Sequence, residues 1–538
     1  MIGNKGHIVF IGVVLIISLI VSFDFKNKLS GEEILNSQKN KSIIIARAND
    51  SISLDPAITT DMESFKVCVN IYDTLVKYEK NGDEIIPSLA ESWETSEDGL
   101  KWVFKLRKGT KFHDGTDFNA HAVQFNFERW MNMDNPYHIG SFSYWSYNFG
   151  QFPRLIRSVT ALSDYSLEIV LNEPYSPFLS TLTMPAFGIA SPDSIIKYNE
   201  SFKDHPVGTG PFEFEYWNKG KEIVLKKNHN YWGNTIKIDK VVFSVVESSE
   251  KRLKFLEEGK VDIADNLTPD EVNRINKNPN LDLYLKSFFN IGYLAMNNQK
   301  KPFDDKNVRK AVGCLIDKDK MVKELFDNLA RPANSFVPPI IWAYNEDVKS
   351  LDYNVDKAKK LLKEAGYEDG FDTTLWVMES PRAYFPDTIG IAKFIKESLL
   401  KANIRVEIIT YSWDEYIEKI KEGEHSLALI GWTGDHIDPD NFLYTFFSSD
   451  NRKTELTSNY SFYKNEEVDK LLKQARQATD REFRKNIYRN LQEIISEDTP
   501  AIPLVHTMPI MGVSKKVKGY TPHLTGEETL EDVHLISD

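Results

Sequence analysis

Cysteine is almost absent from this chain: 538 residues contain two, Cys68 and Cys314, each inside an apolar stretch. Neither has the spacing of a metal-binding motif. Two buried thiols are the default interpretation, and a single disulfide is the weaker alternative. A fold of this length therefore has to be stabilised by large hydrophobic cores rather than by a framework of disulfides.

Motifs for catalysis are also missing. The sequence has no G-x-S-x-G elbow, no Walker loop, no H-E-x-x-H pair and no G-x-G-x-x-G turn. Its eleven histidines are scattered without ligand spacing. The segment Phe112-His-Asp-Gly115 is typical of a solvated turn, because an Asp-Gly pair favours a turn and a lone histidine does not make a metal site. We expect a protein that is not an enzyme and that needs no cofactor.

Clusters of basic residues are absent as well, and the formal net charge is −13. Binding to nucleic acid needs grouped Lys and Arg side chains to neutralise phosphates, so nucleic acid is excluded as a partner. No segment rich in Pro, Gly or Ser separates independent modules. At about 100–200 residues per domain, the length predicts two to four domains. Without linkers, we expect the chain to pass back and forth between them.

One long apolar run is present, at the N-terminus. Lys5 precedes sixteen uncharged residues, Ile8 to Phe23, and Asp24, Lys26 and Lys28 follow. A short basic region before an apolar run is typical of an export signal. The run is only slightly shorter than the roughly 17–25 residues that span a membrane, so retention as an anchor is the alternative to cleavage. Residues 1–40 are therefore assigned to a signal peptide or membrane anchor, and the protein to the outside of the cytoplasmic membrane.

The remaining chain reads as an α/β protein. The first half contains a strand at Ser42–Ala46, a hairpin within Leu89–Arg107 that turns at Asp98-Gly99, and a helix capped by Asn119. Apolar periodicity also predicts a helix that opens with a capping box at Thr479–Glu482 and buries Phe483, Ile487, Leu491 and Ile494.

The second half alternates strands and helices in the doubly wound order. Strands are predicted at Thr374–Met378, Val406–Thr410 and Leu427–Trp432, with helices between them. In this order the ends of parallel strands lie at one edge of the sheet. The loops that follow Trp376 and Trp432 should therefore face the same crevice.

These two loops carry opposite charges. Arg382 lies between two prolines in the first loop, and Asp435 follows Gly434 in the second. An arginine grips a carboxylate and an aspartate pairs with an ammonium, so the two could hold a zwitterion such as a dipeptide. The alternatives are that Arg382 pairs with Asp387 or lies free on the surface, and that Asp435 belongs to an ordinary polar turn.

Several segments, in order along nearly the whole chain from about Lys41, resemble bacterial dipeptide-binding proteins of the peptide/nickel-binding family 5. The clearest are Gly431-Trp-Thr-Gly-Asp435, Asp438-Pro-Asp-Asn-Phe442, Leu89-Ala-Glu-Ser-Trp93, Asn230-Tyr-Trp-Gly233 and Pro302-Phe-Asp-Asp305. The resemblance implies a bilobal periplasmic-binding-protein-like fold of class II. Residues 41–286 and 507–538 would form lobe I, with an inserted subdomain, and residues 287–506 would form lobe II. Two strands, near Phe289 and Val505, would form the hinge.

The same resemblance implies the function and the site. The protein would be the substrate-binding component of an ABC importer that delivers dipeptides to the permease and ATPase complex, as a monomer. A longer peptide, a nickel chelate, haem or glutathione is the alternative ligand. Asp435 would hold the peptide amine and Arg382, in Arg382-Ala-Tyr-Phe-Pro386, the carboxylate.

Two departures from the family pattern accompany this match. Ala383 replaces the family's common proline, which we expect to loosen the loop, and no lipid-accepting cysteine follows the apolar run. Trp432, Gly434, Tyr384 and Trp413 complete the predicted ligand-binding residues. Trp376 is a further candidate for a pocket wall, although large aromatic residues more often belong to the core.

Overall fold

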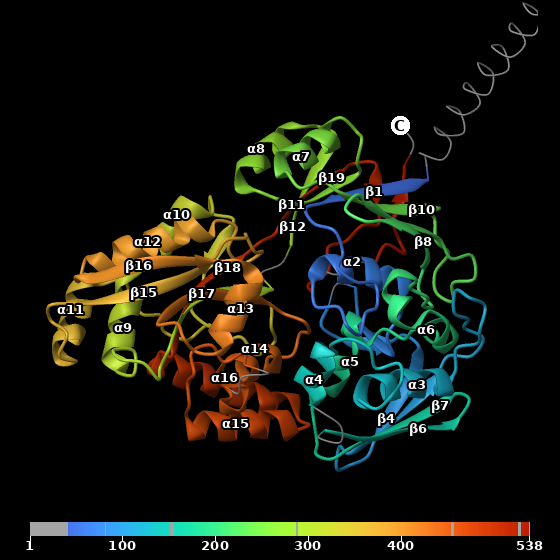
Figure 1. Cartoon of the computed structure of the whole chain (residues 1–538), viewed down its shortest axis with the longest axis horizontal. Helices are drawn as coiled ribbons and strands as arrows, with labels where there is room; N and C mark the ends of the chain where they lie inside the picture. Colours follow the sequence, from blue (N-terminus) through green and yellow to red (C-terminus); the bar gives the residue numbers. More distant parts are fainter. Residues whose placement is uncertain are drawn as a thin grey trace, which may run out of the picture.

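The structure is a computed structural model that describes residues 41–80, 82–150, 155–286, 289–452, 457–525 and 529–536. The chain forms two lobes that lie side by side (Figure 1). The N-terminal segment 1–40 and the expected lobe boundary at residue 287 fall outside the described residues.

Lobe I contains a seven-stranded sheet that combines segments from distant parts of the chain. Its strands, in spatial order, are β12 (Leu281–Leu285), β19 (Ile510–Ser514), β11 (Ile263–Leu267), β1 (Ser42–Arg47), β10 (Lys240–Val245), β9 (Glu222–Lys227) and β8 (Phe212–Asn218). The strand β1 runs parallel to β10 and β11, and the other pairs are antiparallel. The helices of this part are α2 (Met62–Ile71), α6 (Pro192–Tyr198), α7 (Ser249–Glu257) and α8 (Val272–Lys277).

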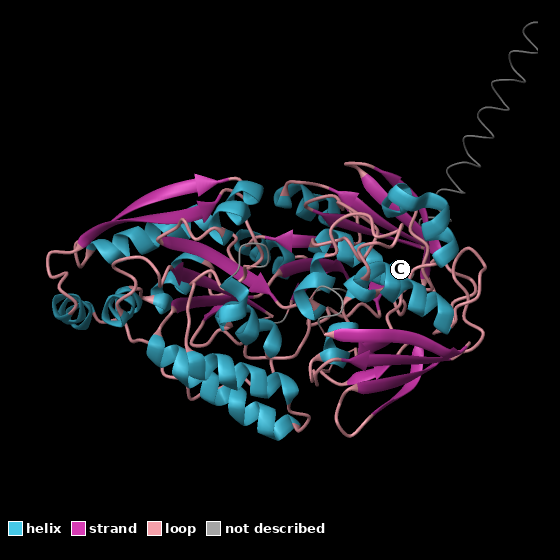
Figure 2. Ribbon diagram, turned by 60° about the horizontal axis from the view of Figure 1, so that its bottom comes forward, coloured by secondary structure: helices cyan, strands magenta, loops and turns pink. Residues whose placement is uncertain are grey.

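Lobe I also contains a four-stranded antiparallel sheet (Figure 2). This sheet has a hydrophobic core of its own. Its strands are β4 (Ala90–Thr95), β5 (Lys101–Leu106), β7 (Ser166–Leu171) and β6 (Ile156–Ser163), and its helices are α3 (Ala120–Met131), α4 (Ser143–Phe149) and α5 (Phe178–Leu182). The predicted hairpin and helix cap are confirmed: Gly99 turns with φ 69°, and Asn119 accepts a hydrogen bond from the N–H of Ala122. The short strands β2 (Val76–Tyr78) and β3 (Ile85–Pro87) pair beside this sheet.

Lobe II is built on a six-stranded sheet. The strands, in spatial order, are β14 (Ala330–Pro332), β18 (Ala501–Thr507), β13 (Asn290–Met296), β17 (Leu427–Thr433), β15 (Phe371–Met378) and β16 (Ile404–Tyr411). Its helices are α9 (Lys306–Leu315), α10 (Lys318–Leu325), α11 (Val355–Glu364), α12 (Thr388–Leu400), α13 (Trp413–Lys421), α14 (Asp440–Phe447), α15 (Glu466–Gln477) and α16 (Arg481–Asp498). One large core of buried aliphatic and aromatic side chains fills this lobe.

The doubly wound order predicted for lobe II is confirmed. Strand β15 runs parallel to both β16 and β17, and α12 and α13 make the connections. Because β15 and β17 are parallel neighbours, the loops that follow them leave the sheet at the same edge. This places the Arg382 loop and the Asp435 turn on one side of lobe II.

The chain crosses between the lobes twice, each time between two consecutive strands that belong to different sheets. Strand β12 belongs to the seven-stranded sheet and β13 to the six-stranded sheet, while β18 and β19 divide in the opposite direction. Figure 1 shows β12 and β19 with lobe I and β18 within the sheet of lobe II. Two crossing segments at adjacent places are the arrangement that lets two lobes move about a hinge.

One predicted helix start was wrong. Helix α16 begins at Arg481 and is capped by Asp480, which accepts the N–H of Phe483, so Thr479 does not form the predicted capping box. Phe483 is 52% exposed. Ile487 and Leu491 are buried as predicted, and Ile495, four residues after Leu491, continues this buried face in place of Ile494, which is only partly buried. The two cysteines are buried in different cores, Cys68 in lobe I and Cys314 in lobe II, as the default interpretation expected.

Candidate functional site

Asp435 follows the end of β17 and is held in place by its own turn. Gly434 donates its N–H to the carbonyl of Phe289 at 2.9 Å. A Cβ at Gly434 would lie 2.5 Å from the Phe289 ring, so this close approach requires glycine. The backbone N–H of Asp435 donates to Asn441 Oδ1 at 2.8 Å. The first residues of α14 therefore fix the turn that presents Asp435.

The Asp435 carboxylate lies where the lobes meet. Its Oδ1 accepts a hydrogen bond from the Tyr144 hydroxyl at 3.0 Å, and its Oδ2 accepts one from the Asn441 amide at 3.2 Å. Tyr144 belongs to α4 of lobe I. Burial raises the pKa of Asp435 to about 6, and the two hydrogen bonds oppose this rise. Over the described part of the chain, no lysine, arginine or histidine forms an ion pair with this carboxylate.

The Arg382 loop is fixed by two glycines of the sheet. Tyr384 and Phe385 pack on Gly431 and Gly292, where an added Cβ would lie 2.4 Å from either ring. The backbones of Arg382 and Phe385 exchange hydrogen bonds of 3.0 and 2.9 Å. The carbonyl of Ala383 accepts a hydrogen bond from the Thr507 hydroxyl at 2.6 Å. These contacts hold the loop despite the alanine in place of proline.

The Arg382 guanidinium lies over the ring of Trp413, with its central carbon 3.6 Å from the ring centroid. Its Nε is buried and makes no hydrogen bond to any described residue. Burial lowers the pKa of Arg382, as expected for a cation held away from water. The alternative pairing with Asp387 does not occur, because Asp387 instead caps α12 by accepting the N–H of Gly390 at 2.8 Å.

The other predicted residues have separate surroundings. Trp432 is partly buried, stacks on Tyr147 of lobe I at 6.2 Å, and donates its indole N–H to Asn441 at 3.1 Å. Trp376, in contrast, is 5% exposed and packs inside the lobe II core against Tyr411. The core interpretation therefore holds for Trp376.

Three residues of this region were missed at the level of the sequence. Tyr144 and Tyr147 reach across from α4, and Asn441 makes three hydrogen bonds that join Asp435 and Trp432. The aromatic run from Phe142 to Phe149 was a visible signal, but nothing in the sequence indicated that it faces a segment almost 300 residues later.

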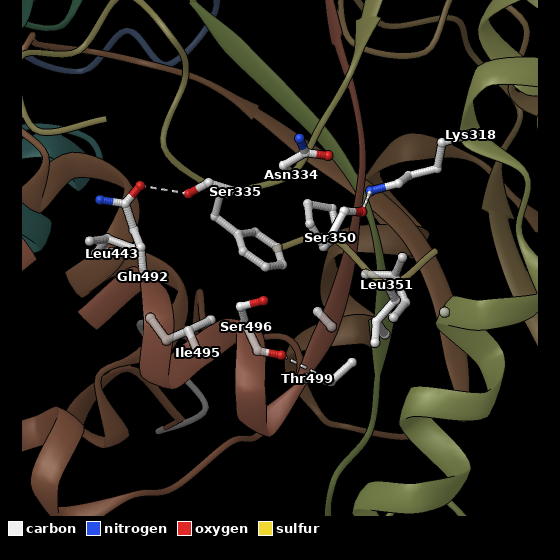
Figure 3. A pocket seen from close by; sticks show the side chains of 15 residues that line it. Lys318, Asn334, Ser335, Ser350, Leu351, Leu443, Gln492, Ile495, Ser496 and Thr499 are labelled. Carbon is white, nitrogen blue, oxygen red and sulfur yellow. Dashed lines mark hydrogen bonds between the residues drawn. The ribbon is translucent and has the colours of Figure 1, made fainter. Parts of the chain in front are cut away.

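A cavity of about 280 Å³ lies against Asp435. Most of its lining comes from lobe I, including Tyr72, Asp73, Lys77 and Tyr78, while Asp435 comes from lobe II. A smaller cavity of about 30 Å³ lies inside lobe II, beside Lys318 and Ser350 (Figure 3). The smaller one has room for about one or two water molecules, so only the larger one suits an organic ligand.

Further contacts join the lobes away from this cavity. The N–H of Ser176 donates to the carbonyl of Arg476 at 2.7 Å, and the Gln477 amide donates to Glu173 at 3.3 Å. Among the described residues, no three His, Cys, Asp or Glu side chains gather where they could hold a metal ion. None of the helices searched in the described segments is long and apolar enough to cross a membrane.

Two α/β lobes that are joined by paired crossings and meet beside a cavity define the class of periplasmic-binding-protein-like receptors. The chain belongs to the family described as "Bacterial extracellular solute-binding proteins, family 5 Middle", whose model matches residues 84–454. It is therefore the solute-binding component of an ABC importer and not an enzyme.

Individual relatives cover almost the whole chain. The dipeptide-binding protein of Escherichia coli is 35% identical over 93% of this chain and 95% of its own length. Haem-binding protein A of Haemophilus influenzae is 33% identical over 95% of each chain. The ABC transporter-associated periplasmic binding protein DppA from Helicobacter pylori, solved in complex with the peptide STSA, is 36% identical, with a TM-score of 0.82 over 93% of this chain and 99% of that one.

Proposed function

We propose that the protein captures short peptides, dipeptides foremost, between its lobes and delivers them to the permease of an ABC importer. The observation that carries this proposal is the pair of opposite charges on neighbouring strand ends of lobe II. Asp435 is a carboxylate without a cation and Arg382 a guanidinium without an anion, within the residues described. A zwitterionic peptide supplies both missing partners.

Each charge is prepared to bind rather than to remain in water. Tyr144 and Asn441 orient the Asp435 carboxylate, and Trp413 supports the Arg382 guanidinium. A carboxylate offers about four lone-pair positions, so two hydrogen bonds leave room for an ammonium. Two fixed, partly desolvated charges select a ligand by its length as well as by its ends.

The names of the relatives support a peptide as the ligand and leave haem as the alternative ligand. The names of the Escherichia coli and Helicobacter pylori proteins refer to a dipeptide and to the peptide STSA, and that of the Haemophilus influenzae protein to haem. Peptides with free ends fit the two unpaired charges. We also propose that the protein is exported and works as a monomer, closing its lobes over the ligand.

Calorimetry with a matched set of ligands tests this function. Ala-Ala should bind to the purified protein, and either N-acetylation or C-amidation should weaken binding by about 2–5 kcal/mol, because each leaves one buried charge without its partner. Titration with haemin tests the alternative ligand. The proposal fails if the acetylated and amidated peptides bind as well as Ala-Ala, or if haemin binds and no peptide does.

Two substitutions assign the ends of the peptide. Asp435→Asn should weaken the binding of Ala-Ala and remove the loss of affinity caused by N-acetylation. Arg382→Gln should also weaken the binding of Ala-Ala and remove the loss of affinity caused by C-amidation. Asp387→Asn is the control, because it lies in the same loop and asparagine also caps helices well. Asp387→Asn should bind like the wild type. Equal sensitivity to acetylation in the wild type and in Asp435→Asn contradicts the role given to Asp435.

A further inference from the structure

The cavity of about 280 Å³ has a definite position relative to Asp435. Its walls come from α2, from β2 and from the C-terminal segment of lobe I, and include Val69, Tyr72 and Thr521. The Tyr78 hydroxyl, also in the wall, accepts the N–H of Ile437 at 3.0 Å. This hydrogen bond fixes the lobe I wall against the turn that carries Asp435.

The chemistry of a peptide determines which part of it reaches this space. The terminal ammonium and the first side chain are bonded to the same carbon atom. If Asp435 holds the ammonium, as in the proposed function on which this inference rests, the first side chain lies nearer to the cavity than the second side chain does. An engineered cavity of roughly 150 Å³ already accepts benzene, so the volume here is enough for an aromatic or a long side chain.

The charges around the cavity are unequal. Four carboxylates line it, those of Asp73, Asp435, Glu531 and Asp532, and two lysines, Lys77 and Lys80. Lys80 pairs with Asp532 at 2.7 Å and Lys77 with Glu531 at 3.7 Å.

The other titratable groups of the wall add no positive charge near pH 7. Burial lowers the pKa of His523 to about 4, so this imidazole is neutral. Asp73 accepts hydrogen bonds from Trp232 and Thr209, both at 2.8 Å. Burial raises the pKa of Asp73. The wall therefore carries an excess of acid groups over the two paired lysines.

We propose that this cavity is the pocket for the first side chain of the bound peptide, and that it selects basic or long neutral side chains over acidic ones. Selectivity arises because an acidic side chain would add one more negative charge to a wall that already has more carboxyl groups than lysines, whereas a basic side chain offsets this excess. The C-terminal segment of lobe I, far from the peptide-gripping turn in sequence, is then part of the specificity element.

Titration of the full chain with paired dipeptides tests the pocket directly. Lys-Ala, Met-Ala and Glu-Ala vary the first position, and Ala-Lys, Ala-Met and Ala-Glu vary the second. We expect Glu-Ala to bind about tenfold or more weakly than Lys-Ala, with Met-Ala between them. The second-position series should not show the same order. Equal affinities along the first series, or the same order in both series, overturn the proposal.

A substitution that fills the cavity separates size from charge. Val69 lies on α2, lines the cavity and is partly buried, so Val69→Trp places an indole in the space. The affinity for Met-Ala should then fall by about tenfold or more, while the affinity for Gly-Ala stays unchanged. Thr521→Trp fills the cavity from the C-terminal segment instead of from α2, so the result does not depend on one variant folding. The control is Ile196→Trp, at a position 48% exposed on α6.

The outcomes distinguish this inference from the proposed function. If no dipeptide binds to the wild-type protein, the proposed function fails and the pocket fails with it. In a second outcome, dipeptide binding depends on Asp435 while both cavity-filling variants lower the affinities for Gly-Ala and Met-Ala equally, or leave both unchanged. This result overturns the pocket and leaves the proposed function standing. Selective loss of Met-Ala binding in either variant supports the pocket.

Discussion

Asp435 and Asp438 lie three residues apart in one turn, yet their surroundings are opposite. Asp438 is 4% exposed and accepts a hydrogen bond from Arg484 at 2.8 Å. Burial acts to raise its pKa, but the charge and hydrogen bond of Arg484, the nearby His436 and the N–H of Asp440 together outweigh burial and hold the pKa below the ordinary value. Asp435 meets only neutral donors among the described residues, and burial raises its pKa to about 6.

The comparison shows how a structural carboxylate differs from one that is available to a ligand. Arg484 also donates to the carbonyl of Ala475 at 2.8 Å, so it is fully engaged within lobe II. Asp438 is thus satisfied by the protein itself. Asp435 stays charged at pH 7 without a protein cation, and a ligand's ammonium is the natural partner. Asp438 therefore has a structural role, because its cationic partner belongs to the same lobe.

The largest effect is expected from breaking the satisfied pair. Arg484→Met leaves Asp438 buried without its cation, which should lower the free energy of unfolding by about 3–5 kcal/mol. Urea denaturation at pH 7 measures this change. Arg481→Met is the matched control, because Arg481 is 57% exposed and pairs with Asp83 at the surface, where an ion pair contributes about 0–1 kcal/mol. Equal losses in the two variants would contradict the comparison.

A smaller effect should appear in the pH dependence of peptide binding. A protonated Asp435 cannot attract an ammonium. The affinity for the peptide should therefore reach its full value above about pH 6 and fall as the pH falls below this value. The expected slope approaches tenfold per pH unit, or ~1.4 kcal/mol. Calorimetry between pH 7 and 5 measures it. His436, beside Asp435, has its pKa lowered to about 4 by burial and does not titrate in this window.

The variant Asp435→Asn serves as the reference for that slope. Burial also raises the pKa of Asp440 to about 6, so a residual slope in the variant reports groups other than Asp435. The slope should be shallower in Asp435→Asn than in the wild type. The same slope in both proteins would assign the pH dependence elsewhere.

The smallest effect concerns the stability of the unliganded protein. The pKa of Asp435 in the folded state lies above its unfolded value of 3.8. The charged carboxylate therefore costs stability above pH 6, and this cost disappears as the pH falls below 4. A pKa raised from 3.8 to about 6 corresponds to ~3 kcal/mol, but Asp435→Asn also leaves the Asn441 amide without its acceptor, which costs about 1–3 kcal/mol. The free energy of unfolding at pH 7 should therefore rise by less than about 1 kcal/mol, and it should not rise at pH 4. Urea denaturation at both pH values checks the sign, and a clear loss at pH 7 would show that Asp435 stabilises the fold.

The sequence was sufficient to predict the arrangement of lobe II because its pattern repeats at short range. Strands β15, β16 and β17 and the helices between them follow from apolar periodicity, and this order places Arg382 and Asp435 at one edge. The position of Phe483 was not predictable in this way. Phe483 lies in the first turn of α16, which is capped by Asp480, and there it is 52% exposed although Ile487 and Leu491 further along the same helix are buried.

Contacts between the lobes could not be predicted from local pattern. Tyr144 and Asp435 are brought together by the folding of two separate cores, and no periodicity relates α4 to β17. The same holds for Asn441, whose amide group joins Asp435 and Trp432. Residue types such as Asp, Pro and Asn predict a polar turn in this segment. They do not predict the direction of the Asn441 side chain, which depends on how α14 packs.

The place of β19 in the seven-stranded sheet has a consequence for how the chain acquires its structure. Residues 510–514 pair with β11 on one side and β12 on the other, so this sheet has a gap until almost the whole polypeptide has emerged. Lobe I begins first along the chain but can be completed only after lobe II has been made. Such long-range pairing slows folding. The seven-stranded sheet therefore cannot close until the C-terminal segment that carries β19 is available.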